Sequence, residues 1–321
     1  MNYTLPIRAT LANRSIAQAV AAPSRNNMVS RITATWEQNG ASADMGPLAA
    51  FNGGASFSGT YAALTLAWPA EKNPRTAGAW WQRIVPDDTA RITVSMACQT
   101  PNASVTVPLI KGVPVPDGAQ ERYGGDETLE LRLQDITGVA GRMTNYALPP
   151  SAADTVDAHT VAASVLGTIS YVCLYNTGPV DGCIERFPNA LMAADDVLIR
   201  QQDTQSPLPG QKRIRYGDRD GVIVYRPVED PAVGAPFALN GTFSPYDLEY
   251  GPRQIASLSL EGRFLRVTTP FINPYLDLAG RIRLTVPYAN LDEIVEIHEM
   301  RWAANPGSET TTLKCRRQYT L

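Results

Sequence analysis

The sequence predicts a mainly β protein in which two antiparallel β-barrel or sandwich domains flank a small α/β segment. Runs of alternating polar and apolar residues recur in both halves of the chain, and this period is typical of strands with one buried face. The 25 prolines and 24 glycines are spread along the 321 residues, which favours many short strands joined by turns. We expect an N-terminal arm and first barrel over 1–135, a connecting α/β segment over 136–205, and a second barrel over 206–321.

The first barrel is expected from five alternating runs that follow a polar arm. Pro6 and Pro23 interrupt any long helix in this arm, which covers residues 1–30. The stretch 41–60 is rich in Gly, Ala and Ser, and we predict a long loop there. The predicted strands of this half are 29–36, 61–68, 91–97, 104–112 and 128–134.

The middle of the chain changes from strand period to helical period. Residues 135–143 predict a short helix, and the prolines at 149 and 150 end it. The stretch 155–169 predicts a second helix, because its apolar residues fall on one side at helical spacing. These apolar residues are Val161, Val165, Leu166 and Ile169. This change of period is the basis for the connecting α/β segment.

Two hairpins are predicted in the second half. The first covers 214–225, with its turn at 217–221. The second covers 254–269, and the dipeptide Glu261-Gly262 supplies its turn.

The chain closes with a predicted antiparallel meander over 279–316. In its first run, Ile282, Leu284 and Val286 alternate with arginines. Adjacent side chains of a strand point to opposite faces, so we expect the three apolar residues to face a core. Arg281 and Arg283 are then expected on the other face.

Composition excludes several classes of partner. The formal net charge is −3, which gives no basic field for sequence-specific nucleic-acid binding. No apolar run reaches the ~20 residues of a membrane-spanning helix, so we expect no stable membrane insertion. The N-terminus lacks a charged segment followed by an apolar core, which predicts synthesis in the cytoplasm without a secretion signal.

The four cysteines, Cys98, Cys173, Cys183 and Cys315, are scattered along the chain. Their spacing fits neither a zinc knuckle nor a redox pair. We expect reduced, mostly buried thiols, because free cysteine is among the most buried residue types. A bridge between Cys173 and Cys183 is the disfavoured alternative, and no cofactor is expected.

The two histidines do not predict a catalytic centre. His159 falls in the predicted second helix of the middle segment, and His298 lies near Glu296 and beside Glu299. No nucleophile elbow, metal-binding helix or phosphate loop accompanies them. We therefore interpret both as structural or exposed residues.

Four acidic or aromatic groups are further candidate sites. These groups are Asp195-Asp196, the turn 217–221, the carboxylates Asp126, Glu127 and Glu130, and the pair Trp80-Trp81. The turn is too short for a calcium loop and lacks its closing Glu. Tryptophan pairs more often pack in cores or interfaces than bind sugars. The sequence thus predicts no catalytic, cofactor-binding or metal-binding residues, and a protein that is not an enzyme.

The order of the elements carries a family resemblance. A turn leading into a Val/Ile strand is followed by a second strand, a strand that ends in Asp, a small helical segment and three closing strands. These elements are 84–94, 108–114, 129–135, 155–169, Gly280, 297–298 and 310–313. In this order they resemble the baseplate hub proteins at the tip of bacteriophage tails, which begin with a tail-tube-like barrel.

The resemblance implies a structural role in the virion. Such hubs form a ring, usually of three subunits, and each subunit contributes two barrels, so that the ring presents pseudo-sixfold symmetry to a hexameric tail tube. The implied partners are other copies of the chain, the distal tail or tail tube protein, the central tip or fibre protein and the tape measure protein.

Three alternatives stay open at the level of the sequence. The chain could be a distal tail or tail tube protein, for which one barrel per chain would be expected instead of two. A virion-associated cell-wall or glycan hydrolase would need two carboxylates or a histidine-based site in a cleft. A carbohydrate-binding module would expose Trp80 and Trp81.

Overall fold

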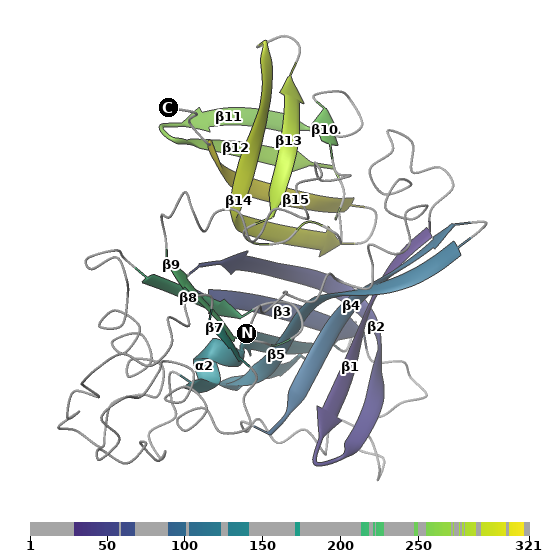
Figure 1. Ribbon diagram of the computed structural model, residues 1–321. Coiled ribbons are helices and arrows are strands. Elements are labelled where there is room, and N and C mark those ends of the chain that lie inside the picture. The colour runs from purple at the N-terminus through teal and green to yellow at the C-terminus, as the bar shows by residue number, and fades with distance from the viewer. Residues whose placement is uncertain are drawn as a thin grey trace, which may run out of the picture.

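The computed structural model describes fifteen strands and one short helix, and the strands form two sheets (Figure 1). The main sheet has twelve strands and the small one has three. The described residues are 29–57, 59–67, 89–100, 103–122, 128–140, 171–173, 213–217, 221, 223–227, 247–249, 255–270, 272, 276, 278, 280–286, 290–305 and 308–317. The predicted arm over 1–28 and the predicted helix over 155–169 lie outside them.

Six strands of the first half close into an antiparallel barrel. Their order is β1-β4-β5-β6-β3-β2, and β2 pairs back onto β1. Closure removes the outer edges that an open sheet would expose. The strands are β1 (Val29–Gln38), β2 (Ala41–Ser56), β3 (Gly59–Ala67), β4 (Arg91–Thr100), β5 (Ala103–Arg122) and β6 (Thr128–Asp135).

The strands of the second half continue the same sheet. Their order beyond β2 is β14-β15-β12-β11, while β13 pairs with β14 and β10 pairs in parallel with β13. The strands are β10 (Asp247–Glu249), β11 (Ser257–Glu261), β12 (Phe264–Thr269), β13 (Arg281–Val286), β14 (Leu291–Asn305) and β15 (Ser308–Arg317). The pairing of β14 with β2 therefore joins the two halves into one hydrogen-bonded sheet.

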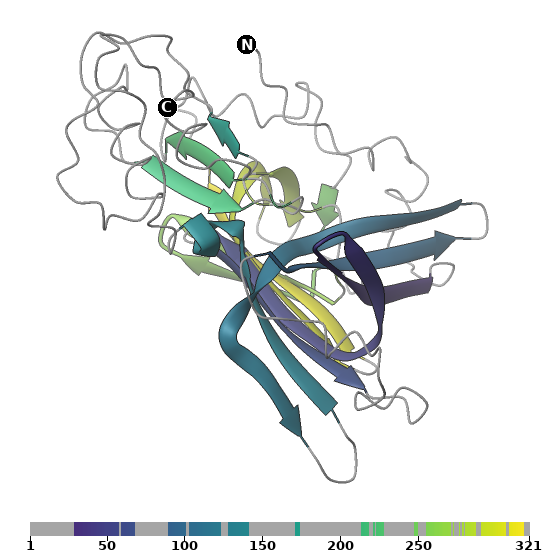
Figure 2. The same cartoon turned by 90° about the horizontal axis from the view of Figure 1, so that it is seen from below.

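A smaller sheet has the order β7-β9-β8 and lies beside the single described helix, α2 (Figure 2). Its strands are β7 (Tyr171–Cys173), β8 (Arg213–Gly217) and β9 (Ile223–Pro227), and α2 covers Ile136–Ala140. The predicted hairpin over 214–225 and the short helix after Asp135 are thereby confirmed. The small sheet takes strands from both sides of the boundary proposed at residue 206, and that boundary stays a prediction.

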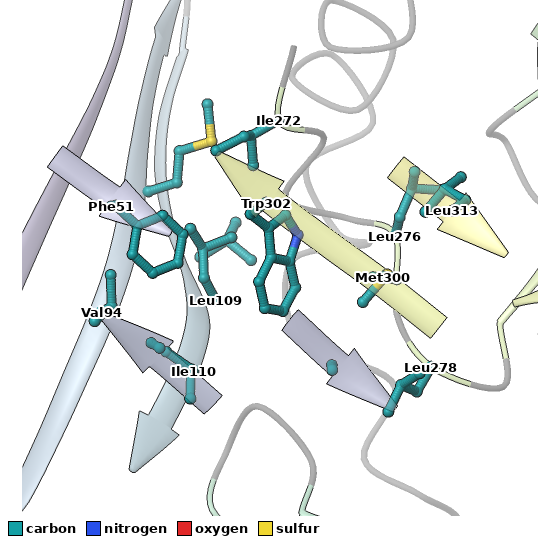
Figure 3. Packing of buried hydrophobic residues seen from close by; sticks show 14 of the residues in the cluster. Phe51, Val94, Leu109, Ile110, Ile272, Leu276, Leu278, Met300, Trp302 and Leu313 are labelled. Atoms are coloured by element: carbon teal, nitrogen blue, oxygen red, sulfur yellow. The ribbon is translucent and has the colours of Figure 1, made fainter. Parts of the chain in front are cut away.

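One apolar cluster fills the space inside both halves. Figure 3 shows Trp302 of β14 between side chains of the first barrel, such as Phe51 and Leu109, and side chains that follow β12, such as Leu276. The rings of Phe51 and Trp302 stack with their centroids 6.2 Å apart. The two halves therefore share a core as well as a sheet.

The prediction of a loop over 41–60 is wrong, because this stretch forms β2 and the start of β3. β2 lies between β3 and β14, and the backbones approach closely there. A Cβ atom on Gly53 would lie 2.9 Å from the carbonyl oxygen of Tyr61, and one on Gly54 would lie 3.0 Å from that of Met300. The small residues that suggested a loop are what this close approach requires.

The register predicted for the closing meander is confirmed at residues 282–284 and 286, while the side chain of Arg281 lies outside the described part of the structure. Ile282, Leu284 and Val286 are buried, and Arg283 is exposed and ion-paired with Asp292. The second hairpin is also confirmed, with Gly262 at a positive φ of 62° in its turn. β14 is longer than predicted and runs from Leu291 to Asn305.

Candidate assembly surface

Eight consecutive strands form a continuous sheet, and the seven strands from β11 to β6 have one face that is polar. Their order is β11-β12-β15-β14-β2-β3-β6-β5, and every neighbouring pair is antiparallel. Alternate residues of each strand enter the core, so the intervening residues share the opposite face. We call this second face the polar face.

One cross-strand row shows how far the polar face extends. Its residues are directly opposite one another on seven successive strands, so they must lie on the same side of the sheet. The row is Ser257, Thr268, Thr312, Arg301, Gly54, Tyr61 and Gln134. Except for Gly54, these residues are exposed or half-buried. The face therefore crosses from the second half to the first without interruption.

Charges of both signs are interspersed on the polar face. Arg266 donates two hydrogen bonds to the carboxylate of Glu261, at 2.7 and 3.1 Å. These bonds, with the positive charges of Arg266 and Lys314, hold the pKa of Glu261 below its usual range. Arg301 donates a hydrogen bond of 2.7 Å to Glu299 in the same way. Such local pairing leaves no strong field of one sign over these strands.

Tyr61 lies over the glycine pair where the two halves meet. A Cβ atom on Gly54 would lie 3.1 Å from the Tyr61 ring and 3.1 Å from its hydroxyl oxygen. The ring thus covers the backbone of Gly54, while 56% of the Tyr61 surface stays exposed. This position gives the polar face an aromatic residue at its middle.

A β-bulge in β14 marks the point where this strand changes neighbours. β14 pairs with β13 through residues 291–296 and with β2 through 299–304. Between them, the register against β15 shifts from Ile297 to Glu299, which leaves His298 as the extra residue. A bulge bends its strand and increases the local twist, and this allows β14 to pair with β13 before the bulge and with β2 after it.

The side chain of His298 fills a site at this bulge between two phenylalanine rings. Its ring centroid lies 4.8 Å from that of Phe57 and 5.6 Å from that of Phe264, both edge to face. Its Nε2 atom lies 3.2 Å from Oε1 of Glu296. Both polar side chains are largely buried, at 13% and 11% exposure. The aromatic packing indicates that His298 stabilises the bulge.

Asp135 connects the barrel to the small sheet. Its Oδ1 atom accepts hydrogen bonds from the backbone N–H of Thr137, at 3.0 Å, and from the Thr137 hydroxyl. Its Oδ2 atom accepts one from the backbone N–H of Gly217, at 3.3 Å. A Cβ atom on Gly217 would lie 2.8 Å from that of Asp135, so this approach needs glycine. The same carboxylate thus begins α2 and holds the end of β8.

The residues weighed as sites from the sequence do not come together in the described part of the chain. Glu130 lies on β6 and is half-buried, while His298 lies at the bulge. Among the residues that the structure describes, no group of three or more His, Cys, Asp or Glu could hold a metal ion. His159, Asp126, Glu127, Asp195, Asp196, Trp80, Trp81 and Cys183 lie outside the described residues, as do the side chains of Cys98 and Cys173.

Cys315 agrees with the prediction of a reduced, buried thiol. It lies on the core side of β15, and burial raises the pKa of its thiol. Sequence reasoning missed the polar face and the pairing of β14 with β2. The alternation within each strand was visible in the sequence, but the order in which distant strands pair was not.

None of the helical residues that could be described forms a segment long and apolar enough to cross a membrane. No protein-family model matches the chain. No curated protein matches it in sequence either.

Solved structures resemble the chain over most of its length. A tail protein from Neisseria meningitidis MC58 matches with a TM-score of 0.57 at 9% identity, covering 90% of this chain and 97% of that one. The 43 kDa tail protein of prophage MuSo2 from Shewanella oneidensis matches with a TM-score of 0.54 at 9% identity, covering 89% and 98%.

A third match comes from a secretion system. It is an E. coli type VI secretion component described as similar to the T4 bacteriophage tail proteins gp27 and gp5. Its TM-score is 0.52 at 10% identity, over 85% of this chain and 74% of that one. At such identities a likeness concerns the fold, and on that basis the chain has the mainly β, tail-tube-like fold of bacteriophage tail proteins.

Proposed function

We propose that this protein is a structural component of a bacteriophage tail, and specifically the baseplate hub ring at the tail tip. The observation that carries the proposal is the continuous eight-strand sheet, which has a core on one side and, from β11 to β6, the polar face on the other. Among the described residues of this face, Tyr61 is the one large apolar side chain that is exposed. A surface of this kind suits the wall of a channel better than a buried contact.

The ring is proposed to contain three copies of the chain. Each copy supplies two strand groups, the closed barrel and the β10–β15 group, so three copies would present six similar units to a hexameric tail tube. The proposed neighbours are the tail tube or distal tail protein on one side and the tip or fibre protein on the other. The tape measure protein would end within the ring.

The polar face also supports a passive role in the passage of DNA. Its charged residues have both signs: Glu130, Arg132, Glu261, Arg266, Glu299, Arg301 and Lys314. A uniformly basic wall would hold a polyanion through its phosphates, and a mixed wall would not. We therefore propose a structural, non-enzymatic protein of the virion.

Electron microscopy of the purified chain tests this proposal, alone and mixed with the tail tube protein of the same phage. We expect threefold rings that bind one end of a tube. Rings of six identical copies would instead assign the chain to the tube or distal tail, with one chain per unit. Hydrolysis of peptidoglycan by the purified chain, lost on changing one carboxylate or histidine, would contradict the non-enzymatic role.

A further inference from the structure

We propose that neighbouring copies join by pairing β11 of one chain with residues 119–122 of β5 of the next. The eight-strand sheet would then continue from copy to copy. This inference rests on the proposed ring and adds the strands that close it.

The two strand segments are the outer edges of the same sheet. Among the strands that the structure describes, β11 pairs with β12 alone, and residues 119–122 pair with β6 alone. β4 accompanies β5 only as far as Gly112. The outer backbone N–H and C=O groups of both segments can therefore accept another strand, which is how β-strand addition joins two chains.

The strand directions match for a contact between opposite edges. All seven pairings along the sheet are antiparallel, so the first strand, β11, and the eighth, β5, run in opposite directions. Placing β5 of one copy beside β11 of the next continues the antiparallel pattern. Such a contact uses two different surfaces, and repeating it can close a ring of identical copies.

The apolar side chains of β11 indicate that its edge is covered in the assembly. Leu258 lies opposite Val267, and Leu260 lies opposite Leu265, so both leucines are on the core side of the sheet. Val267 and Leu265 are fully buried, whereas Leu260 is 68% exposed. At this edge the buried residues of β12 are therefore followed by a leucine that is exposed to solvent, and the sheet of a neighbouring copy would cover it.

The backbone of Leu260 also points to the outer edge. The hairpin loop between β11 and β12 has two residues, 262–263, so Glu261 and Phe264 form a hydrogen-bonded pair. Hydrogen-bonded and non-bonded pairs alternate along an antiparallel ladder, which directs the N–H and C=O groups of Leu258 and Leu260 away from β12. Leu260 would therefore contribute a backbone donor, a backbone acceptor and an apolar side chain.

The offset between the two edges suits a closed ring. The cross-strand row that starts at Ser257 reaches β5 at Val113, and residues 119–122 lie further along that strand. A copy paired in the proposed way is displaced along the strands relative to its neighbour. Closed sheets require such a stagger, and their strands tilt to the axis as a result.

Two substitutions at Leu260 test the contact in the full-length chain. Leu260→Pro removes the outward backbone N–H, and Leu260→Lys places a charge at the edge. Neither substitution changes a backbone group that hydrogen-bonds to β12. We expect the ring fraction in mass photometry to fall by at least ~10-fold, because every contact of the ring is altered. The melting temperature should shift by less than ~4 °C, since an exposed side chain is changed. Ser259→Lys, one residue away on the polar face, is the matched control and should keep its rings.

Cross-linking identifies the partner strand. Glu121 is directly opposite the buried Leu129, so position 121 lies on the core side of the sheet, as Leu260 does. We expect the double variant Leu260→Cys with Glu121→Cys to form covalent dimers and trimers with a short bis-maleimide, and each single variant to match the wild-type background. Cross-linking of Leu260→Cys alone would indicate a β11–β11 dimer and overturn the proposal. Intact rings of Leu260→Pro would also overturn it while leaving the proposed hub in place. A wild-type chain that forms no ring, even with the tube protein, would overturn both the strand contact and the proposed hub ring.

Discussion

Neighbouring residues of β13 have opposite surroundings, and this sets what each contributes to stability. Leu284→Ala should lower the free energy of unfolding by ~2–5 kcal/mol, because it leaves a cavity at a fully buried position. Arg283→Ala should change it by less than ~1 kcal/mol, because its ion pair with Asp292 is exposed. Urea unfolding of both variants checks the difference. A reversed order would show that the register is wrong by one residue.

The buried thiol of Cys315 should make stability depend on pH in alkaline solution. Burial raises its pKa in the folded state, so below the unfolded value of ~8.5 both states carry the neutral thiol. Above that value the unfolded chain loses a proton that the folded chain keeps, and stability falls by ~1.4 kcal/mol per pH unit. Cys315→Val keeps an apolar side chain of similar size, and it should reduce the slope by this amount in urea titrations above pH ~9. An unchanged slope would contradict the burial of this thiol.

At the scale of elements, the sequence predicted the strands better than their partners. The alternation in 128–134 and 282–286 identified β6 and β13, because bulky residues mark the buried face of each. β2 was missed because its glycines and alanines fit the close approach of β3 and β14 and leave no alternation of large residues. The pairing of β14 with β2 depends on a bulge at His298, and a single extra residue leaves little trace in a periodic pattern.

The glycines of β2 should be intolerant of even a methyl group. Gly53→Ala places its Cβ against the backbone carbonyl of Tyr61, which cannot rotate away, so we expect a loss of ~1–3 kcal/mol in unfolding free energy. Asn52→Ala, at the preceding exposed position, is the control and should cost less than ~0.5 kcal/mol. Equal stability of the two variants would mean that β2 and β3 are further apart than described.

Asp135 should determine how firmly α2 and β8 are held to the barrel. Asp135→Ala removes the acceptors of Thr137 and Gly217, and we expect ~1–3 kcal/mol of destabilisation with faster amide exchange in both elements. Asp135→Asn keeps one side-chain oxygen and should lose less. If exchange at Thr137 and Gly217 stays as slow in Asp135→Ala as in the wild type, the proposed connection does not operate.

At the scale of the whole molecule, the shared core predicts that the two halves unfold together. Trp302 of β14 stacks on Phe51 of the barrel, and β14 pairs with β2, so neither half can open without exposing apolar surface of the other. Far-ultraviolet dichroism and tryptophan fluorescence should therefore report the same midpoint in denaturant. Trp302→Ala should lower that midpoint in both signals, while two separated transitions would show independent halves.

The ladder between β2 and β14 also has a mechanical consequence. Its rungs, from Glu299–Ser56 to Ala304–Phe51, lie across the strands. When the two halves are pulled in opposite directions along these strands, the force acts on all of the hydrogen bonds between β2 and β14 at the same time. A pull across the strands would instead break these hydrogen bonds one after another. Force spectroscopy through handles at the two ends of this ladder should give a higher rupture force in the first geometry than in the second.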